Sequence, residues 1–343
     1  MSSALVKKLL SQENLDFILK RRAHIEKILS SFKLNLDETS IEKNIVPKVF
    51  LYGSSVSGTS FLGGDADYSV VFEDISADGK YIVDISRTAH ERVLSSLYHH
   101  LCASDSSFSS RSQRIFKARI PILQFQEVGG HKFDVSLSTD GIKNSVLLRS
   151  YMQVNPRLRL GVLSAKQWGR EHSILNARKG FISPYALTIM YIYFMRETKR
   201  LSCFLDENAS AEETSKLLKQ ADANIKTPFY DLLPFVSSDI EEVRQDVYAF
   251  FKFFGDPDNF DFDSSVIDIR NNNPVHTKEK WLDCLKTISD EERWHLLGHQ
   301  VLLLRDPFES HNLGRSVDFF RGEAIREAFR TSAVKKEKIT LLE

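Results

Sequence analysis

Two aspartates one residue apart, Asp65 and Asp67, impose the strongest constraint on how this chain can fold. They follow a Gly/Ser-rich segment and precede an apolar run that ends at Phe72. In a β-strand, residues i and i+2 project from the same face, so a strand that begins here holds both carboxylates side by side. Adjacent anions repel each other unless a cation lies between them, and Mg²⁺ prefers hard oxygen ligands. A turn or a helix cap carries the same residues, so the pair alone leaves both interpretations open.

The segment before the aspartates offers groups that suit a phosphate. Gly53 and Ser54 supply a backbone N–H and a hydroxyl in a turn that follows an apolar run. Gly53 and Gly58 also have the spacing of a P-loop, but a P-loop continues with Lys and then Ser or Thr. Thr59 follows directly here, so the missing lysine argues against a P-loop. A phosphate-binding turn beside two carboxylates favours nucleotide chemistry.

Length and charge limit the possible classes of protein. The 343 residues are 42% hydrophobic, which is enough for two domains with their own cores. The formal net charge is zero, so contacts with nucleic acid must come from local basic patches. The three cysteines are far apart and lack metal-ligand spacing, which favours a reducing compartment without structural disulfides. No apolar run approaches the about 20 residues of a membrane-spanning helix, so no membrane partner is expected.

The first half of the chain predicts a mixed sheet with helices. A third aspartate, Asp134, falls on the second strand of a hairpin whose turn contains Gly129 and Gly130. It alternates with Phe133 and Val135, so it projects from the opposite face of that strand. Asp134 is therefore a third candidate ligand, with a solvated strand residue as the alternative. The predicted elements are strands at 46–52, 67–72, 118–125 and 132–137 and a helix at 86–101.

The second half of the chain predicts helices. Lys166 and Arg170 are spaced i, i+4 and share one helix face. Ser183 precedes Pro184 as a helix N-cap. The predicted helices are 144–153, 158–172, 185–195 and 240–254, and the polar, acidic residues 204–225 predict a surface insertion.

Together these patterns predict an α+β fold with two domains. Residues 1–140 form the sheet-containing catalytic domain, and residues 141–343 form a mostly helical domain. The N-terminal residues, 1–36, read as an amphipathic helical segment that could pack on the second domain instead of the first.

At this point the order of the motifs resembles the polymerase-beta-type nucleotidyltransferases. The turn at Gly53, the Asp65-Ala66-Asp67 motif and Asp134 on a later strand carry this resemblance. The helical half is similar to the associated domain of noncanonical poly(A) polymerases and terminal uridylyltransferases. The resemblance spans about residues 45 to 320, and it is strongest to the minimal trypanosomal uridylyltransferases, particularly the mitochondrial ones associated with editosome-like complexes. Four further stretches support it: 119–121, 144–149, 166–168 and 306–309.

The resemblance implies an active site in the cleft between the two domains. Asp65 and Asp67 are expected to bind two Mg²⁺ ions, for which Mn²⁺ can substitute, and Asp134 to complete one site beside an RNA 3′-hydroxyl. In two-metal catalysis one ion lowers the pKa of the attacking hydroxyl and the other neutralises the leaving pyrophosphate. The implied activity is template-independent RNA terminal uridylyl transfer, in which UMP from UTP is added to the 3′-OH of single-stranded RNA.

The resemblance also implies a set of nucleotide-binding residues. Lys166 and Arg170 are expected to clamp the phosphates, with a solvated helix face as the alternative. Tyr185 is expected to stack on the base. The family commonly has a serine before this tyrosine, whereas this chain has Pro184, so Ser183 either substitutes for that serine or simply caps the helix. The full set is Gly53, Ser54, Asn144, Ser145, Lys166, Arg170, Ser183, Tyr185, Asp306 and Glu309.

The choice of base is assigned to Asp306 and Glu309. Uracil presents an N3–H donor and an O4 acceptor, and carboxylates near N3 favour it over adenine. Without the resemblance, Asp306-Pro307 is only a turn. Asn144 and Ser145 are expected at the ribose and phosphates, with helix capping as their alternative role.

Arg119 is the expected contact to RNA, together with the basic residues of 111–117. Phosphate contacts with little base readout give salt-sensitive binding to a single-stranded 3′ end. Ordinary surface charge is the alternative. The resemblance further implies an RNA-editing protein complex as a partner and the mitochondrial matrix as the compartment, with the cytoplasm as the alternative; no DNA partner is expected.

Three other functions remain open. A noncanonical poly(A) polymerase would use ATP in place of UTP. A catalytically silent RNA-binding subunit is disfavoured because such a protein has no need of three mutually repulsive carboxylates. A small-molecule nucleotidyltransferase is disfavoured by the long helical half.

Overall fold

A computed structural model describes residues 12–35, 44–75, 81–109, 111–126, 130–201, 237–270, 273–336 and 338–342. The described chain divides into two compact units at Ser150, and we call them the sheet unit (12–150) and the helical unit (151–342). The sequence predicted this division at residue 140. The observed division comes later in the chain, because the first turns of the helix that begins at residue 140 pack on the sheet. The predicted insertion at 204–225 lies outside the described residues.

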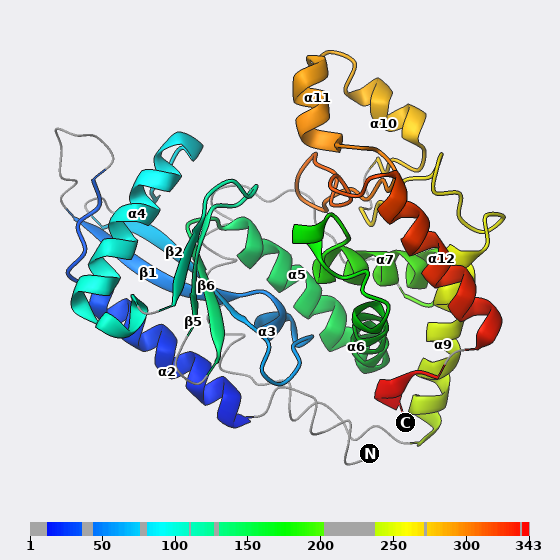
Figure 1. The fold of residues 1–343 in the computed structure, drawn as a ribbon, viewed down its shortest axis with the longest axis horizontal. Helices are drawn as coiled ribbons and strands as arrows, with labels where there is room; N and C mark the ends of the chain where they lie inside the picture. Colours follow the sequence, from blue (N-terminus) through cyan, green and yellow to red (C-terminus); the bar gives the residue numbers. More distant parts are fainter. Residues whose placement is uncertain are drawn as a thin grey trace. The chain divides into compact units, whose positions relative to one another are not determined.

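The sheet unit is built on one mixed sheet (Figure 1). Its strand order is β1-β2-β6-β5-β4, and β3 pairs with the outer part of β2. β2 and β6 run parallel, and all the other pairs are antiparallel. The strands are β1 (Ile45–Tyr52), β2 (Ala66–Asp74), β3 (Tyr81–Ile82), β4 (Ser112–Ile115), β5 (Ile122–Gln126) and β6 (Lys132–Ser136).

Helices cover both faces of this sheet. Two long helices, α2 (Gln12–Leu29) and α4 (Arg87–Ser104), bury apolar residues against one face. The other face carries the start of α5 (Asp140–Val154), where Ile142 and Val146 pack on Phe50 and Val71. Two short helices, α3 (Ser54–Ser57) and η1 (Ser106–Phe108), complete the unit.

The position of α2 corrects one expectation. The described residues of the N-terminal helix pack on the sheet, because Ile18, Ile25 and Leu29 recur at helical spacing and are buried in the core of the sheet unit. Tyr68 of β2 also donates a hydrogen bond of 2.9 Å to the carbonyl of Ile18. Over the described residues, α2 therefore belongs to the sheet unit and not to the second domain.

The hairpin is confirmed, with one boundary moved. β5 begins at Ile122, and residues 118–120 lie outside the strand, because Pro121 has no N–H to donate to a ladder. Phe133 and Val135 of β6 are buried and Asp134 is half-buried, as the alternation predicted. The sequence did not predict β4, whose residues are polar and which forms an edge of the sheet.

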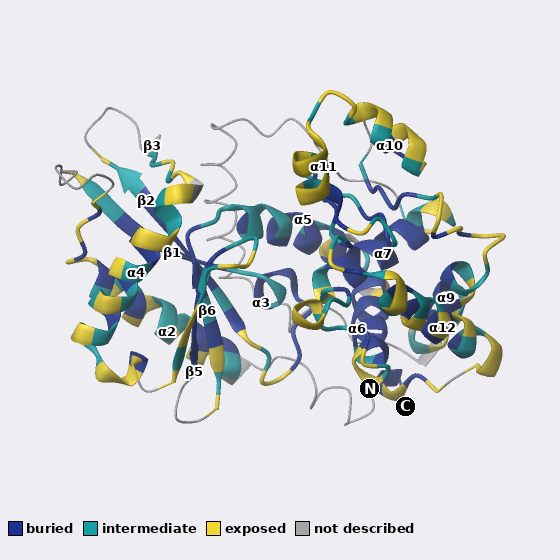
Figure 2. Cartoon of the chain, turned by 45° about the horizontal axis from the view of Figure 1, so that its top comes forward, coloured by how far each residue is buried: buried dark blue, intermediate teal, exposed yellow. Residues whose placement is uncertain are grey.

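The helical unit has an aromatic core. Trp168 packs on Phe251 and Phe329, with ring centroids 4.6 and 4.8 Å apart, and its Nε1 donates to Ser332 Oγ at 2.8 Å. Figure 2 shows that α6 and α7 are largely buried, whereas α10 and α11 are exposed. The elements are α6 (Pro156–Glu171), η2 (Ala177–Lys179), α7 (Pro184–Glu197), α9 (Ser237–Gly255), α10 (Lys278–Cys284), α11 (Asp290–Leu297), α12 (Phe319–Lys335) and η4 (Thr340–Leu342).

A second, smaller core lies under α10 and α11. It contains Val266, Trp281, Leu297 and Leu303. The sequence did not predict these two short helices, because their charged residues hide the helical period. None of the helices in the described part of the chain is long and apolar enough to cross a membrane.

Candidate active site

Four polar side chains form one row across the sheet. Tyr52 pairs in register with Asp67, Asp67 with Asp134, and Asp134 with Gln124, on four successive strands. Residues in register on neighbouring strands project from the same face about 5 Å apart. The alternate residues of β2, such as Tyr68, are buried toward α2 and α4, so the row faces the side of the sheet on which α5 lies.

Asp67 and Asp134 are the centre of this row. Both are half-buried, and Gln124 Nε2 donates to Asp134 Oδ1 at 2.9 Å. Burial raises the pKa of the Tyr52 hydroxyl well above its usual range, and the negative charges of Asp67 and Asp134 raise it further. Tyr52 is therefore a neutral neighbour within the electrostatic field of both carboxylates.

Gly53 follows Tyr52 directly and makes room for the Asp67 carboxylate. Its φ is +77°, a backbone conformation that L side chains rarely adopt. A Cβ on this residue would lie 2.0 Å from Asp67 Oδ2. The Gly53 N–H donates to Ser145 Oγ at 2.6 Å, and Ser145 Oγ donates to the carbonyl of Gly141 at 2.5 Å. The predicted phosphate-binding turn is thus connected to α5 through one serine.

The two α5 residues predicted to bind the nucleotide have different surroundings. α5 begins at Asp140, so Asn144 and Ser145 lie beyond its first turn and neither is its N-cap. Ser145 is buried, and its hydroxyl orients Gly53. Asn144 Oδ1 is buried and accepts no hydrogen bond in the described part of the protein. The helix-capping alternative therefore does not account for either residue.

The three carboxylates suit a partly hydrated Mg²⁺ ion better than a closed protein cage. Asp65 immediately precedes β2 and is exposed to solvent. Among the described residues, no three His, Cys, Asp or Glu side chains already surround a common point as ligands. Mg²⁺ keeps several waters and is commonly bound by one or two protein carboxylates together with substrate phosphates. The Asp67–Asp134 pair with the exposed Asp65 fits that mode of binding.

Arg119 lies in the bend before β5, the strand that carries Gln124, and it is half-buried. Arg111 and Arg114 are exposed beside and on the edge strand β4, and the Arg114 guanidinium lies 5.1 Å from the centroid of the Tyr98 ring. The basic residues predicted to contact RNA therefore belong to one edge region of the sheet.

In the helical unit, the predicted phosphate clamp has one buried and one exposed member. Lys166 is only 5% exposed, whereas Arg170, one turn later on α6, is exposed. The alternative of a solvated helix face is therefore wrong for Lys166.

The start of α7 is organised as the sequence predicted. Ser183 caps the helix by accepting a hydrogen bond of 3.0 Å from the N–H of Ala186, and Pro184 occupies the first helical turn. The capping role of Ser183 is confirmed. Tyr185 is half-buried in this first turn.

The two residues predicted to read the base lie on one tight loop. Asp306 is 3% exposed, and its Oδ1 accepts hydrogen bonds from the N–H groups of Phe308 at 2.9 Å and Glu309 at 3.1 Å. Glu309 Oε2 lies 3.4 Å from Nδ1 of the buried His311. The carboxylates of Asp306 and Glu309 therefore have fixed positions relative to each other.

Asn312, which no sequence pattern indicated, holds this loop. The side chain is fully buried, and its Oδ1 accepts from the N–H groups of Leu304 and Gly314, both at 2.9 Å. Its Nδ2 donates to the carbonyls of Leu297 and Leu302. The local sequence gives no signal for this role, because all four partners are backbone groups.

Asp268 is a second buried support, also missed from the sequence. It is 2% exposed, and it accepts hydrogen bonds from the Arg270 guanidinium (2.7–3.2 Å) and from the N–H of Val275 (2.9 Å). Burial disfavours the charged form, but these hydrogen bonds outweigh it and lower the pKa of Asp268 below its usual value. The neighbouring Ile267 bridges to Leu304, so Asp268 stabilises the base of the loop that carries Asp306.

Asp268→Asn is expected to lower the free energy of unfolding by roughly 3 kcal/mol at pH 7, because it leaves the half-buried Arg270 without its anion. Since the folded pKa is depressed, this stabilisation is present above the unfolded pKa of about 3.8 and is lost as the pH falls through the lower folded value. Denaturant unfolding of wild type and variant as a function of pH checks this, with Asp283→Asn on α10 as the exposed control. If the difference in unfolding free energy between wild type and Asp268→Asn stayed constant below pH 4, the stabilising role of the Asp268 charge would be contradicted.

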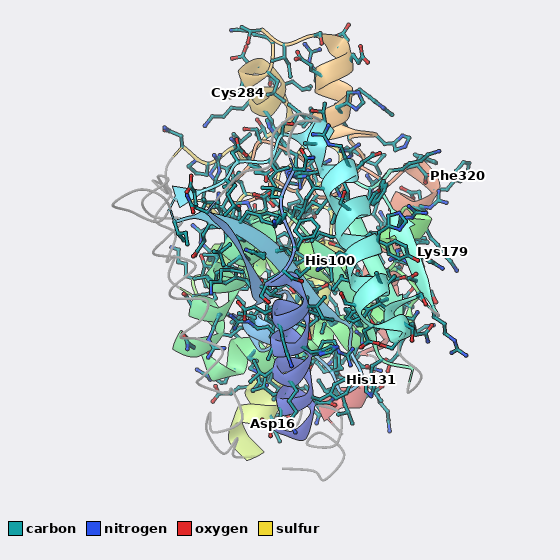
Figure 3. The ribbon with its side chains drawn as sticks, turned by 90° about the vertical axis from the view of Figure 1, so that its left-hand side faces the viewer. Asp16, His100, His131, Lys179, Cys284 and Phe320 are labelled. Atoms are coloured by element: carbon teal, nitrogen blue, oxygen red, sulfur yellow. The ribbon has the colours of Figure 1, made fainter. Side chains whose placement is uncertain are left out.

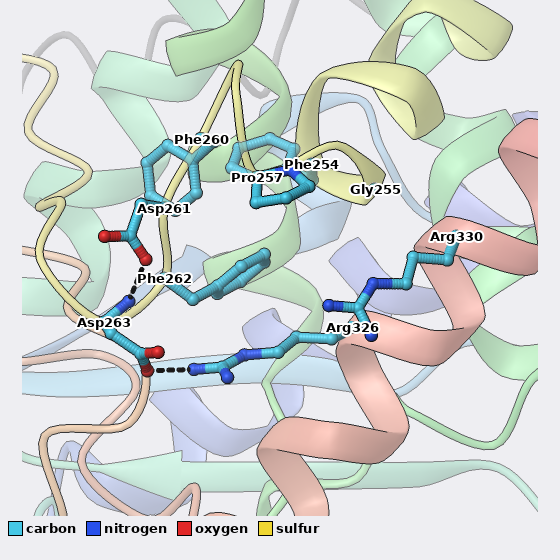
Figure 4. Close-up of a pocket in the computed structure, with 9 residues that line it drawn as sticks. All are labelled: Phe254, Gly255, Pro257, Phe260, Asp261, Phe262, Asp263, Arg326 and Arg330. Atoms are coloured by element: carbon cyan, nitrogen blue, oxygen red, sulfur yellow. Dashed lines mark hydrogen bonds and ion pairs between the residues drawn. The ribbon is translucent and has the colours of Figure 1, made fainter.

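One small cavity of the helical unit lies apart from all these residues (Figure 4). It has a volume of about 80 Å³ and is lined by aromatic rings of α9 and the loop that follows, together with Arg326 and Arg330 of α12. Arg326 is engaged by Asp263 at 2.6 Å and Glu323 at 2.9 Å. No residue predicted to bind a nucleotide lines this cavity, so it does not mark the predicted site.

The first unit is thus a mixed sheet that carries the carboxylate row, and a helical unit follows it. Residues 1–153 match the family model of the poly(A) RNA polymerase, mitochondrial-like, central palm domain. The poly(A) RNA polymerase GLD2 of Rattus norvegicus is 24% identical over 277 residues, which are 79% of this chain and 52% of that protein. The Danio rerio GLD2 is 26% identical over 305 residues, 85% of this chain and 55% of that protein.

Solved structures show the same fold over nearly the whole chain. Terminal uridylyl transferase 4 from Trypanosoma brucei with bound UTP has a TM-score of 0.67 at 20% identity and covers 99% of this chain and 94% of its own. RNA Editing TUTase 1 from the same organism, in complex with UTP, has a TM-score of 0.70 at 18% identity, covering 99% and 85%. A complex of mtPAP with UTP has a TM-score of 0.65 at 22% identity, covering 98% and 67%.

Residues 1–153 are therefore similar to this palm domain, and the solved structures share the fold of nearly the whole chain. The predicted α+β fold class is confirmed. The chain spans about half the length of the curated relatives it matches.

Proposed function

We propose that this protein is a template-independent RNA nucleotidyltransferase that transfers a nucleoside monophosphate from a nucleoside triphosphate to an RNA 3′-hydroxyl and releases pyrophosphate. One observation carries the proposal: Asp67 and Asp134 are in register on neighbouring parallel strands, beside a glycine that leaves room for the Asp67 carboxylate. Two carboxylates side by side repel each other, and nothing in the fold of the sheet requires that arrangement. A site for divalent cations explains it.

Asp65, Asp67 and Asp134 would hold the divalent ions. Bound there, the ions supply positive charge that activates the RNA hydroxyl and neutralises the triphosphate. The protein's own groups position the substrates. Gly53 and Ser54 offer a turn for the phosphates, held by Ser145, and Asn144 has a buried oxygen that can accept a hydrogen bond from a ribose hydroxyl.

The helical unit carries a second set of groups with the chemistry of a nucleotide-binding site. The buried Lys166 and the exposed Arg170 of α6 carry charges that suit phosphates. Tyr185, in the first turn of α7, offers an aromatic face for the base. We therefore propose that the sheet unit performs the transfer and the helical unit selects the nucleotide.

We propose UTP as the preferred substrate. Asp306 and Glu309 bring two carboxylates onto one tight loop, and a carboxylate oxygen can accept the N3–H of uracil but finds no equivalent donor at N1 of adenine. The nucleotides seen with structural relatives do not decide this point: a uridylyl transferase has been seen with GTP, and mtPAP with UTP.

ATP is the second candidate substrate, because the curated relatives are poly(A) RNA polymerases. The decisive test is extension of a single-stranded RNA primer with each of the four nucleoside triphosphates separately, in Mg²⁺, in Mn²⁺ and with a chelator. UTP extension that the chelator abolishes is the expected result. Preferential extension with ATP would assign a poly(A) polymerase, and no extension with any nucleotide would indicate a silent RNA-binding subunit.

Asp306→Asn is expected to lower the preference for UTP over ATP about 10- to 100-fold, since one charged hydrogen bond to the base contributes roughly 1.5–3 kcal/mol. Asparagine keeps an oxygen for the N–H groups of Phe308 and Glu309, so the loop stays folded. The ratio of kcat/KM for the two nucleotides measures the effect. Asp283→Asn on α10 serves as the control, and an unchanged ratio in Asp306→Asn would place base selection elsewhere.

The compartment and any RNA-editing complex stay predictions from the resemblance. Fractionation of the cells that express the protein, followed by isolation of the tagged full chain, would test both.

A further inference from the structure

The most exposed aromatic side chains in the described part of the protein are adjacent. Phe319 and Phe320 begin α12 and are 63% and 81% exposed. Their rings meet edge to face with centroids 5.8 Å apart. Exposing two neighbouring phenylalanines to water is unfavourable, so such a pair indicates a binding surface.

Basic residues flank this pair. Arg321 Nε donates to the carbonyl of Lys179, and the Arg321 guanidinium lies 5.9 Å from the centroid of the Phe181 ring. The first turn of α12 is therefore attached to η2, whose residues Arg178 and Lys179 are exposed. Figure 3 shows Phe320 and Lys179 projecting from the same side of the molecule.

The acidic residues nearby are engaged within α12. Asp318 caps the helix by accepting from the N–H of Arg321 at 3.0 Å, and it pairs with the Arg321 guanidinium. Glu323 pairs with Arg326 at 2.9 Å. The exposed Arg178 and Lys179 of η2 bring two basic side chains to this surface.

We propose that Phe319, Phe320, Arg178 and Lys179, which we call the aromatic platform, bind the single-stranded RNA that leads to the 3′ end. Bases of any identity stack on aromatic rings, and cations follow the phosphates, so this combination suits a single strand bound with little sequence preference. The platform is close in sequence to Tyr185, the residue predicted to stack on the base. A short segment leads from η2 to Ser183, the N-cap of α7, and Tyr185 lies in the first turn of that helix. The proposal rests on the proposed function, because it takes RNA as the substrate.

The test compares RNA and UTP binding by the full chain. Replacing Phe319 and Phe320 together by serine is expected to weaken binding of a single-stranded RNA oligonucleotide on the order of tenfold or more, while UTP binding is unchanged. Phe320→Trp is expected to keep the affinity, because it retains an aromatic face. Val334→Ser is the matched control: it removes an 83% exposed apolar residue from the same helix, about 20 Å along its axis.

Two further measurements separate stacking from charge. The first measurement uses an RNA oligonucleotide that lacks bases at its upstream positions. It should bind wild type and the double serine variant with equal affinity. That affinity should match the weak affinity of the double serine variant for the intact RNA. Replacing Arg178 and Lys179 by glutamine should make the plot of log K against log salt shallower by about 1.4, as expected for two lost phosphate contacts to a single strand.

The outcomes distinguish the platform from the proposed function. If wild type binds and extends RNA but the double serine variant does so equally well, the platform is wrong and the enzyme assignment stands. If Val334→Ser lost as much RNA affinity as the double serine variant, the platform would also be wrong, because the effect would not be specific to Phe319 and Phe320. If wild type binds no RNA at all, the platform and the proposed function both fail.

Discussion

Asp67→Ala is expected to abolish nucleotide transfer while the protein stays folded. The loss should be at least about 10³-fold in kcat/KM, because stabilisation by a metal-bound carboxylate contributes several kcal/mol to the transition state. The same variant should unfold at an equal or higher temperature than wild type without divalent ions. Asp67 and Asp134 are in register, so removing one charge relieves their repulsion. Primer extension and thermal denaturation measure the two effects.

The opposite signs of these two effects distinguish a functional carboxylate from a structural one. Asp65→Ala should also abolish transfer, and it should leave stability unchanged because Asp65 is exposed. Asp84→Ala removes an exposed aspartate elsewhere in the same unit and serves as the control. Retained transfer in Asp65→Ala or Asp67→Ala would show that the metal site is misassigned.

Gly53→Ala should reduce transfer at least about 100-fold although it adds a single methyl group. The added Cβ would lie 2.0 Å from Asp67 Oδ2, so the carboxylate must leave its place in the row. A misplacement of about 1 Å in a catalytic geometry can cost about 10²-fold in rate. The φ of +77° adds a strain of about 1–3 kcal/mol to the folded state. Kinetics and denaturant unfolding of the variant report the two contributions separately.

Gly63→Ala is the matched control for Gly53→Ala. Gly63 has a similar φ of +72°, but a Cβ there would meet no atom within 4 Å. The control should lose stability through backbone strain while keeping its activity. If Gly63→Ala lost as much activity as Gly53→Ala, backbone strain and not the collision with Asp67 would be the cause.

Local periodicity was enough to predict part of the site. The spacing placed Asp67 on a strand correctly, whereas Asp65, predicted to open the same strand, lies one residue before it. The alternation around Asp134 predicted its face correctly. The N-cap at Ser183 was also predictable, because capping depends on residues three positions apart. In each case the determining contacts lie within a few residues of one another.

The surroundings of the site could not be predicted in this way. Gln124 hydrogen-bonds Asp134 only because β5 pairs with β6 in one particular register. Lys166 has the sequence spacing of a solvated helix face, yet it is buried. Asn312 and Asp268 support the loop of Asp306 through backbone groups that any residue could provide.

The sequence by itself therefore determined the fold class, the strand faces of Asp67 and Asp134 and the family resemblance, since these depend on local spacing and on the order of motifs. Only the tertiary structure decided that Tyr52, Asp67, Asp134 and Gln124 form one row and that Gly53 makes room for the Asp67 carboxylate. The physical reason is that strand register and side-chain burial depend on contacts between residues far apart in the chain, which no local pattern encodes.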